Sequence, residues 1–122
     1  MKICDEMIKL RDKLDKRGIK WKDVSEITPE SVIKKMVEKG LDRKFADTTI
    51  FRTHFEHDNY KYSVIYGFGT YGGVDVLSGH DFGMLECMTE KINGGEPLGN
   101  LTAKDVLDII DGTYKEREQN AD

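Results

Sequence analysis

The chain has 122 residues, of which 34% are charged and 38% are apolar, and its formal net charge is −4 at pH 7. A chain of this length builds one hydrophobic core, so we expect a single domain over residues 1–122. No window approaches the roughly 20 apolar residues of a membrane-spanning helix, and two acids within the first six residues do not fit a signal peptide. We therefore expect a cytoplasmic protein with no membrane partner.

Charge is distributed unevenly along the chain. Residues 1–47 contain 13 Lys/Arg and 10 Asp/Glu, whereas residues 48–122 contain 6 and 13. The basic residues of the first half alternate with acids, as on a solvated helix face, and do not form the concentrated basic patch that binds a phosphate backbone. Duplex nucleic acid is therefore not an expected partner.

The first part of the chain predicts two helices separated by a short strand. Apolar residues at helical spacing indicate an amphipathic helix from about residue 3 to Arg17. Residues 19–24 begin with the alternation of a strand. A second helix opens at Thr28-Pro29 and ends near Gly40.

An antiparallel hairpin is predicted next, because β-branched and aromatic residues become dense. Its strands cover residues 49–55 and 60–66, joined by a turn at 56–59. In the first strand Arg52 and His54 share one face.

The C-terminal half predicts a loop followed by two helices. Residues 67–83 contain six glycines and form an extended loop. Leu85, Met88 and Ile92 lie on one stripe of an expected helix capped by Asp81. A last helix begins at Thr102 with a capping box, and residues 116–122 form a frayed tail.

These elements together predict an α+β fold. We expect a small, three-stranded, mostly antiparallel sheet packed against three to four helices. Three strands leave two edges, and one of them can pair with a second copy of the chain. A homo-oligomer is therefore expected.

The glycine-rich loop contains short motifs found in nucleotide-binding proteins, but without their context. Gly67-x-Gly69-x-x-Gly72 matches the dinucleotide fingerprint, and Asp81-Phe82-Gly83 matches the magnesium motif of kinases. The fingerprint must open a helix directly after its strand, and a kinase needs further catalytic motifs in a much longer chain. Neither match therefore identifies a site.

The physical properties of the loop nevertheless favour a binding site. Glycines let backbone N–H groups gather around an anion, while two loop aromatics can stack on a planar ring and an arginine can bind a phosphate through two hydrogen bonds. The expected ligand-binding residues are Arg52, His54, Tyr71, Gly72, Gly73 and Phe82. The alternative is a loop shaped only by packing, with both aromatic side chains in the core.

No catalytic or metal constellation is recognised. Cys4 and Cys87 fall in expected helices beside apolar neighbours, as reduced buried thiols do. His54 and His57 would leave opposite faces of a strand end, so no metal ligands are expected. We expect no cofactor and no catalytic residues, and a small hydrolase built on His54 and Glu56 is the catalytic alternative.

Three stretches resemble one group of proteins. They are Phe51–Gly73, Phe82–Glu86 and Asn93–Val106. They are similar to small uncharacterised phage and prophage proteins of Gram-positive bacteria, with a likeness over residues 1–24 and 50–111. Relative to that pattern, the helical segment at about residues 25–47 is an insertion.

Phage proteins of this kind include antagonists of host defence. Some are anti-Thoeris-like sponges that sequester cyclic ADP-ribose isomers, and others are anti-CRISPR-like inhibitors that block an effector. The resemblance implies a non-enzymatic antagonist of bacterial immunity that sequesters a nucleotide-derived signalling molecule in the cytoplasm of an infected host. Its partner would be a small anionic, nucleotide-like ligand. The alternative is a protein–protein inhibitor whose acidic C-terminal part occludes a host defence effector.

Overall fold

The structure, a computed structural model, describes residues 2–40, 42–43 and 49–116. It is an α+β fold, as predicted, in which the described residues form three α-helices and six strands of an antiparallel sheet. The elements are α1 (Asp5–Lys16), β1 (Trp21–Asp23), β2 (Glu26–Ile27), α2 (Glu30–Glu38), β3 (Thr49–His57), β4 (Tyr60–Tyr66), β5 (Leu85–Thr89), the 3-10 turn η2 (Asn93–Gly95), β6 (Leu98–Leu101) and α3 (Ala103–Asp111). None of the described helices has the length and apolar character needed to cross a membrane.

The sheet has twice the predicted number of strands. Its order is β1-β3-β4-β5-β6, and β2 also pairs with β3. The predicted helix carrying Leu85, Met88 and Ile92 is wrong, because residues 85–89 form β5. Every residue of β5 except Met88 is buried, and Glu86 on the Met88 side binds the Tyr71 N–H of the glycine-rich loop, so the alternation that marks a half-exposed strand is missing.

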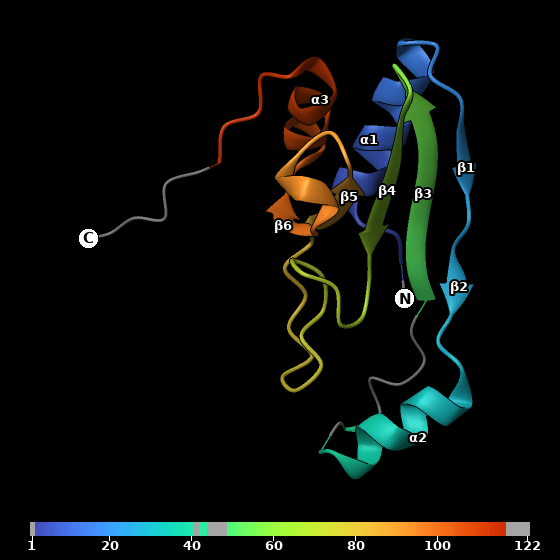
Figure 1. Ribbon diagram of the computed structural model, residues 1–122. Coiled ribbons are helices and arrows are strands. Elements are labelled where there is room, and N and C mark those ends of the chain that lie inside the picture. Colours follow the sequence, from blue (N-terminus) through green and yellow to red (C-terminus); the bar gives the residue numbers. More distant parts are fainter. Residues whose placement is uncertain (1, 41, 44–48, 117–122) are drawn as a thin grey trace.

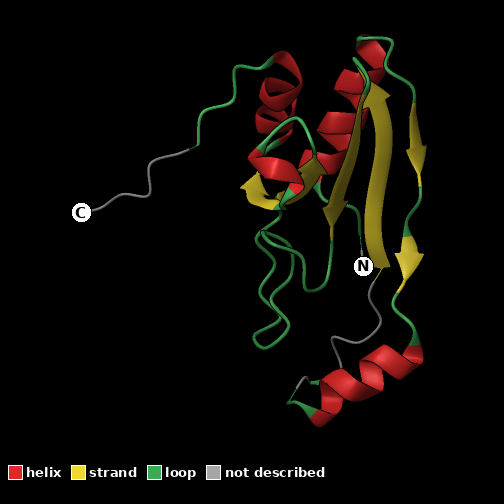
Figure 2. Ribbon diagram, viewed as in Figure 1, coloured by secondary structure: helices red, strands yellow, loops and turns green. Residues whose placement is uncertain are grey.

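The sheet and two helices form two layers (Figure 2). Helices α1 and α3 pack on one face and leave the upper part of the other face without a helix (Figure 1). The core between the layers includes the fully buried side chains of Leu10 and Leu14 from α1 and of Val106 from α3. Val64 and Leu85 meet them from the sheet.

The predicted hairpin is confirmed, with a tighter turn. Strands β3 and β4 pair as far as His57 and Tyr60, so only Asp58 and Asn59 form the turn. Both have positive φ angles, 50° and 68°, as a type I′ turn requires.

The segment expected to be an insertion, residues 25–47, begins inside the sheet. Strand β2 pairs with β3, and α2 follows it. Met36 of α2 packs against a second small core formed by Phe68 and Val74 of the glycine-rich loop, together with Ile50. The last residues of this segment lie outside the described ranges, as does the expected frayed tail beyond Glu116.

Strands β1 and β2 pair with β3 in one continuous register, so residues 21–27 together form one edge of the sheet. Between them, the Val24 N–H donates to the Arg52 carbonyl at 3.0 Å, and the Arg52 N–H donates to Ser25 Oγ at 3.1 Å. The Asp23 carboxylate accepts hydrogen bonds from the N–H and hydroxyl of Ser25. The Ser25 hydroxyl thus completes the hydrogen-bond ladder with β3 by accepting from the Arg52 N–H. The Asp23 carboxylate accepts from the Ser25 N–H, a donor that would otherwise be exposed at the sheet edge.

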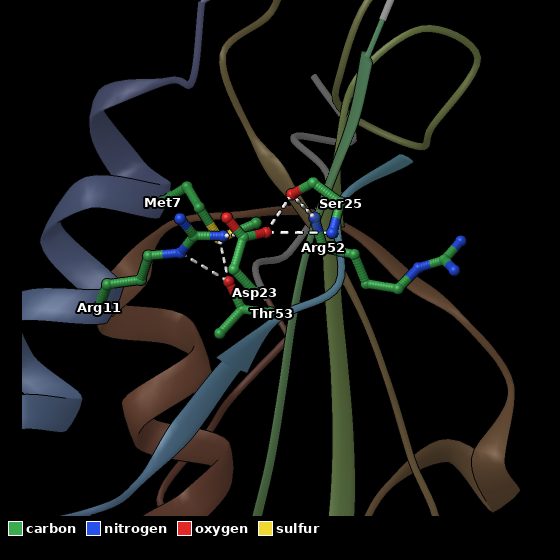
Figure 3. Close-up of polar contacts among 6 residues, drawn as sticks. All are labelled: Met7, Arg11, Asp23, Ser25, Arg52 and Thr53. Carbon is green, nitrogen blue, oxygen red and sulfur yellow. Dashed lines mark hydrogen bonds and ion pairs between the residues drawn. The ribbon is translucent and has the colours of Figure 1, made fainter. Parts of the chain in front are cut away.

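Helix α1 is attached to this edge strand through Arg11 (Figure 3). Its Nε donates to Thr53 Oγ1 at 2.9 Å, and its guanidinium lies 3.4 Å from the Asp23 carboxylate. The same guanidinium stacks 4.6 Å from the centroid of the Trp21 ring. Thr53 is fully buried and donates to Met7 Sδ. One arginine therefore connects the helix to the edge strand β1 and to its neighbour β3.

Candidate ligand-binding site

The upper part of the helix-free sheet face forms a shallow pocket of about 600 Å³, which we call the sheet-face pocket. Its floor follows from the strand register. Lys22 lies opposite His54, His54 opposite Ser63, and Ser63 opposite Met88, so these four side chains form one row across four strands. Because successive residues of a strand point to opposite faces, the core residues of these strands lie beneath this row.

A second row of charged residues closes one end of the pocket. Glu56 lies opposite Lys61, and Lys20 and Glu90 complete the charged lining. Gly95 of η2 also lines this end, where a side chain would collide with the Glu90 carboxylate.

The lysines of the sheet-face pocket are available for an incoming anion. Among the residues that the structure describes, the ammonium groups of Lys20, Lys22 and Lys61 form no ion pair. Glu56 and Glu90 are likewise unpaired, so the pocket contains three cations and two anions. The excess is positive, unlike the net charge of the chain.

Two uncharged groups complete the floor. His54 Nε2 lies 3.1 Å from Ser63 Oγ, so the imidazole and hydroxyl form one hydrogen-bonded pair. Met88 is partly buried beside Ser63 and supplies an apolar surface. The pocket therefore offers cations, hydrogen-bonding groups and an apolar contact to one small molecule.

The six predicted ligand-binding residues are not gathered in one pocket. His54 lines the sheet-face pocket and Phe82 lines a separate groove beside the N-terminal end of α1. Arg52 shares a face with His54, but its guanidinium lies 3.4 Å from the Glu26 carboxylate at the sheet edge. Its side chain points away from the Arg11 network (Figure 3).

The glycine-rich loop is ordered by its own hydrogen bonds. The Gly72 and Gly73 carbonyls accept from the N–H groups of Met84 and Phe82. The Tyr71 N–H donates to the buried Glu86 carboxylate at 2.8 Å. Many of the backbone N–H groups of the loop, which were expected to bind an anion, therefore donate to acceptors within the protein.

The loop aromatics are not core residues, so the alternative that both are packing anchors is wrong. Tyr71 is 63% exposed and Phe82 is 57% exposed. The ring of Phe82 meets that of His80 edge to face at 4.4 Å. Asp81 does not cap a helix; it accepts a hydrogen bond from the Tyr66 hydroxyl at 2.6 Å.

Neither thiol has the properties of an activated nucleophile. Both cysteines are free and buried, although Cys87 lies in a strand and not in the expected helix. Burial raises the pKa of Cys87 to about 12 and also raises the pKa of Cys4. Within the described part of the chain, no three His, Cys, Asp or Glu side chains are grouped as metal ligands would be.

The sequence could have indicated part of the sheet-face pocket. Lys61 and Ser63 are two residues apart on β4, so their side chains share a face, and the hairpin register places Ser63 opposite His54. All three side chains therefore lie on one face of the hairpin. Met88 gave no such signal because its segment matched a helical stripe.

The fold and the site together define an α+β protein with a one-sided antiparallel sheet and a positively charged pocket on its open face. Comparisons with protein-family models, curated proteins and solved structures find no match. The resemblance to phage proteins accordingly stays a prediction.

Proposed function

We propose that this protein is a non-catalytic binding protein that captures a small anionic, nucleotide-like ligand in the sheet-face pocket. The observation that carries the proposal is the convergence of three unpaired lysines, Lys20, Lys22 and Lys61, around the hydrogen-bonded pair of His54 and Ser63. Ammonium groups bind phosphate oxygens, and a hydroxyl–imidazole pair can donate to or accept from a ribose or base.

The size and floor of the pocket support a ligand of this class. Pockets for small molecules commonly enclose roughly 300–1,000 Å³, and the sheet-face pocket has about 600 Å³. The thioether of Met88 offers a polarisable surface for a planar ring beside the charged groups.

With the resemblance to phage antagonists of host defence, the proposed biological role is sequestration of a nucleotide-derived immune signal in an infected bacterium. Sequestration requires binding without turnover, and the two buried thiols with raised pKa are consistent with that requirement. Arg52 lies two residues from His54 on the same face of β3 and is proposed as an auxiliary contact.

The first test is native mass spectrometry of the protein purified from bacteria with an active nucleotide-signalling defence system. We expect a bound nucleotide that is released intact by heat denaturation, and the same spectra report the number of chains per oligomer. A hydrolysed product would instead support the small hydrolase, and apo protein that also fails to bind cyclic ADP-ribose isomers, ADP-ribose and NAD in titrations would overturn the proposal.

The site itself is tested with a charge-matched pair of double variants. Lys22→Ala/Lys61→Ala should weaken ligand binding about tenfold or more, because two charge-assisted contacts are lost. Lys13→Ala/Lys39→Ala removes the same charge from α1 and from the residue that follows α2, and should leave the affinity within about twofold. Equal losses in both variants would show that the effect is only net charge.

A third variant tests the loop contacts predicted from sequence. If Tyr71 and Phe82 belong to the ligand site, Tyr71→Ala/Phe82→Ala weakens nucleotide binding as strongly as the lysine pair does. If the sheet-face pocket is the whole site, this variant binds nucleotide normally.

A further inference from the structure

The glycine-rich loop, residues 67–84, forms a hairpin-like projection below β5 and β6 (Figure 1, yellow-green to yellow). Its two arms are joined where the Gly73 carbonyl accepts from the Phe82 N–H at 3.0 Å and where the Asp75 N–H donates to the His80 carbonyl at 2.9 Å. Leu77 belongs to the turn that connects Asp75 to His80 at the tip.

This projection exposes large apolar side chains. Tyr71 is 63%, Leu77 70% and Phe82 57% exposed. Single exposed apolar side chains are common on protein surfaces, but here three come from one loop of 18 residues and are available to a partner.

The exposed side chains are held by an ordered backbone. Tyr71 is fixed on both sides, since its N–H donates to Glu86 and its carbonyl accepts from the Asn100 N–H at 3.2 Å. Gly73 leaves no room for a side chain, because a Cβ there would lie 2.2 Å from the Gly67 carbonyl oxygen. A preformed loop loses little conformational entropy when it binds, and tight association benefits from that.

The charge of the projection selects its partner. No Lys or Arg occurs between Lys61 and Lys91, whereas Asp75 and Asp81 lie in the loop itself. The Asp75 carboxylate accepts hydrogen bonds from the N–H and hydroxyl of Ser78, which lower its pKa and hold the charge near the tip. The groove beside Phe82 is acidic on balance, because Asp5, Glu6 and Asp81 line it with a single lysine, Lys2. Such a surface repels the phosphate of a nucleotide and attracts Lys and Arg side chains.

We propose that the loop is a docking element for a protein whose contacting surface is basic and offers apolar pockets for the exposed side chains. Aromatic side chains presented in this way commonly dominate binding energy at protein interfaces. This inference does not depend on the proposed function, because the sheet-face pocket and the loop have opposite charge and share no lining residue.

The test uses a display library of random 12-residue peptides selected on the immobilised full-length protein. We expect the enriched peptides to combine Lys or Arg with aromatic or branched apolar residues, and to bind more weakly as salt rises. Tyr71→Ala/Phe82→Ala should weaken their binding about tenfold or more. Ile8→Ala, which removes an exposed apolar side chain from α1, should not.

Three results would overturn the inference. They are a selection without enrichment, enrichment of acidic peptides, and equal binding by the loop variant. Self-association in light scattering that Tyr71→Ala/Phe82→Ala abolishes would assign the loop to a second copy of the chain. The lysine variant Lys22→Ala/Lys61→Ala should keep peptide binding, so failure of the nucleotide proposal and failure of this one are distinguished.

Discussion

Glu6 of α1 accepts a hydrogen bond of 2.9 Å from the backbone N–H of Ala103, the first residue of α3. The N-terminal end of α3 already has a capping box, in which Thr102 Oγ1 accepts from the Asp105 N–H and the Asp105 carboxylate accepts from the Thr102 N–H. Glu6 thus satisfies a further donor of this helix end from another helix. The capping of α3 therefore depends in part on α1 being packed against it.

Replacing Glu6 by Ala should lower the free energy of unfolding by about 1–2 kcal/mol, because a helix-end donor and a favourable charge at the helix N-terminus are lost together. Urea unfolding followed by circular dichroism measures this change. Lys9→Ala is the control, since Lys9 is an exposed partner of Glu6 at 3.3 Å and should matter by less than about 0.5 kcal/mol. Equal effects of the two changes would contradict the capping role.

Thr53→Val should destabilise the fold by about 1–3 kcal/mol, because the partly buried Nε of Arg11 then has no acceptor. Adding Arg11→Met removes the stranded donor and should recover part of the loss. The double-mutant cycle, measured by chemical unfolding, should therefore give a coupling energy above about 0.5 kcal/mol. Additive losses would mean that the Arg11–Thr53 hydrogen bond is energetically unimportant.

The edge strand predicts a pH dependence of stability. Hydrogen bonds from Ser25 lower the pKa of Asp23 below its ordinary value of 3.8. When the pKa of a carboxylate is lower in the folded state, the ionised group stabilises the fold at pH values above its unfolded-state pKa. This stabilisation is lost as the pH falls through the folded-state pKa. Asp23→Asn should therefore be less stable than the parent at pH 6, with a difference that shrinks below about pH 4. A difference that stays constant from pH 7 to pH 2.5 would argue against this account.

The buried thiols predict slow alkylation. With a pKa of about 12, Cys87 is ionised in only roughly one molecule in ten thousand at pH 8, and its side chain is only 1% exposed. Iodoacetamide should modify it rapidly only after urea unfolding, as intact-mass measurements would show. Rapid modification of Cys87 in the folded protein would show that β5 opens easily or that the thiol is accessible.

Sequence patterns predicted the elements whose structure depends on near neighbours. The capping box at Thr102 and the turn at Asp58 and Asn59 are local, and so is the apolar stripe of α1. Strand β6 was missed because Gly99 and Asn100 are poor strand formers. It pairs because β5 is beside it, and the φ of 57° at Asn100 accommodates an irregular register.

The candidate site was predictable to a similar extent. His54 and its face of the hairpin followed from the two-residue period. The neighbouring positions Lys22 and Met88 come from strands that meet the hairpin only through sheet order, which a single sequence does not encode locally. The prediction that Tyr71 and Phe82 lie on a glycine-rich loop is confirmed. The separation of the groove that contains Phe82 from the pocket that contains His54 depends on tertiary packing.

The parallel attachment of α1 to α3 has a consequence for biosynthesis. Glu6 bonds to Ala103, and Arg17 bonds through two hydrogen bonds to Asp111, so the first helix is fastened at both ends to a segment made more than 90 residues later. While the ribosome is still translating the sheet, the apolar stripe of α1 has no helical neighbour. The packing of α1 on α3 must therefore wait until α3 has emerged, so the last part of the chain to be made completes the core around the first helix.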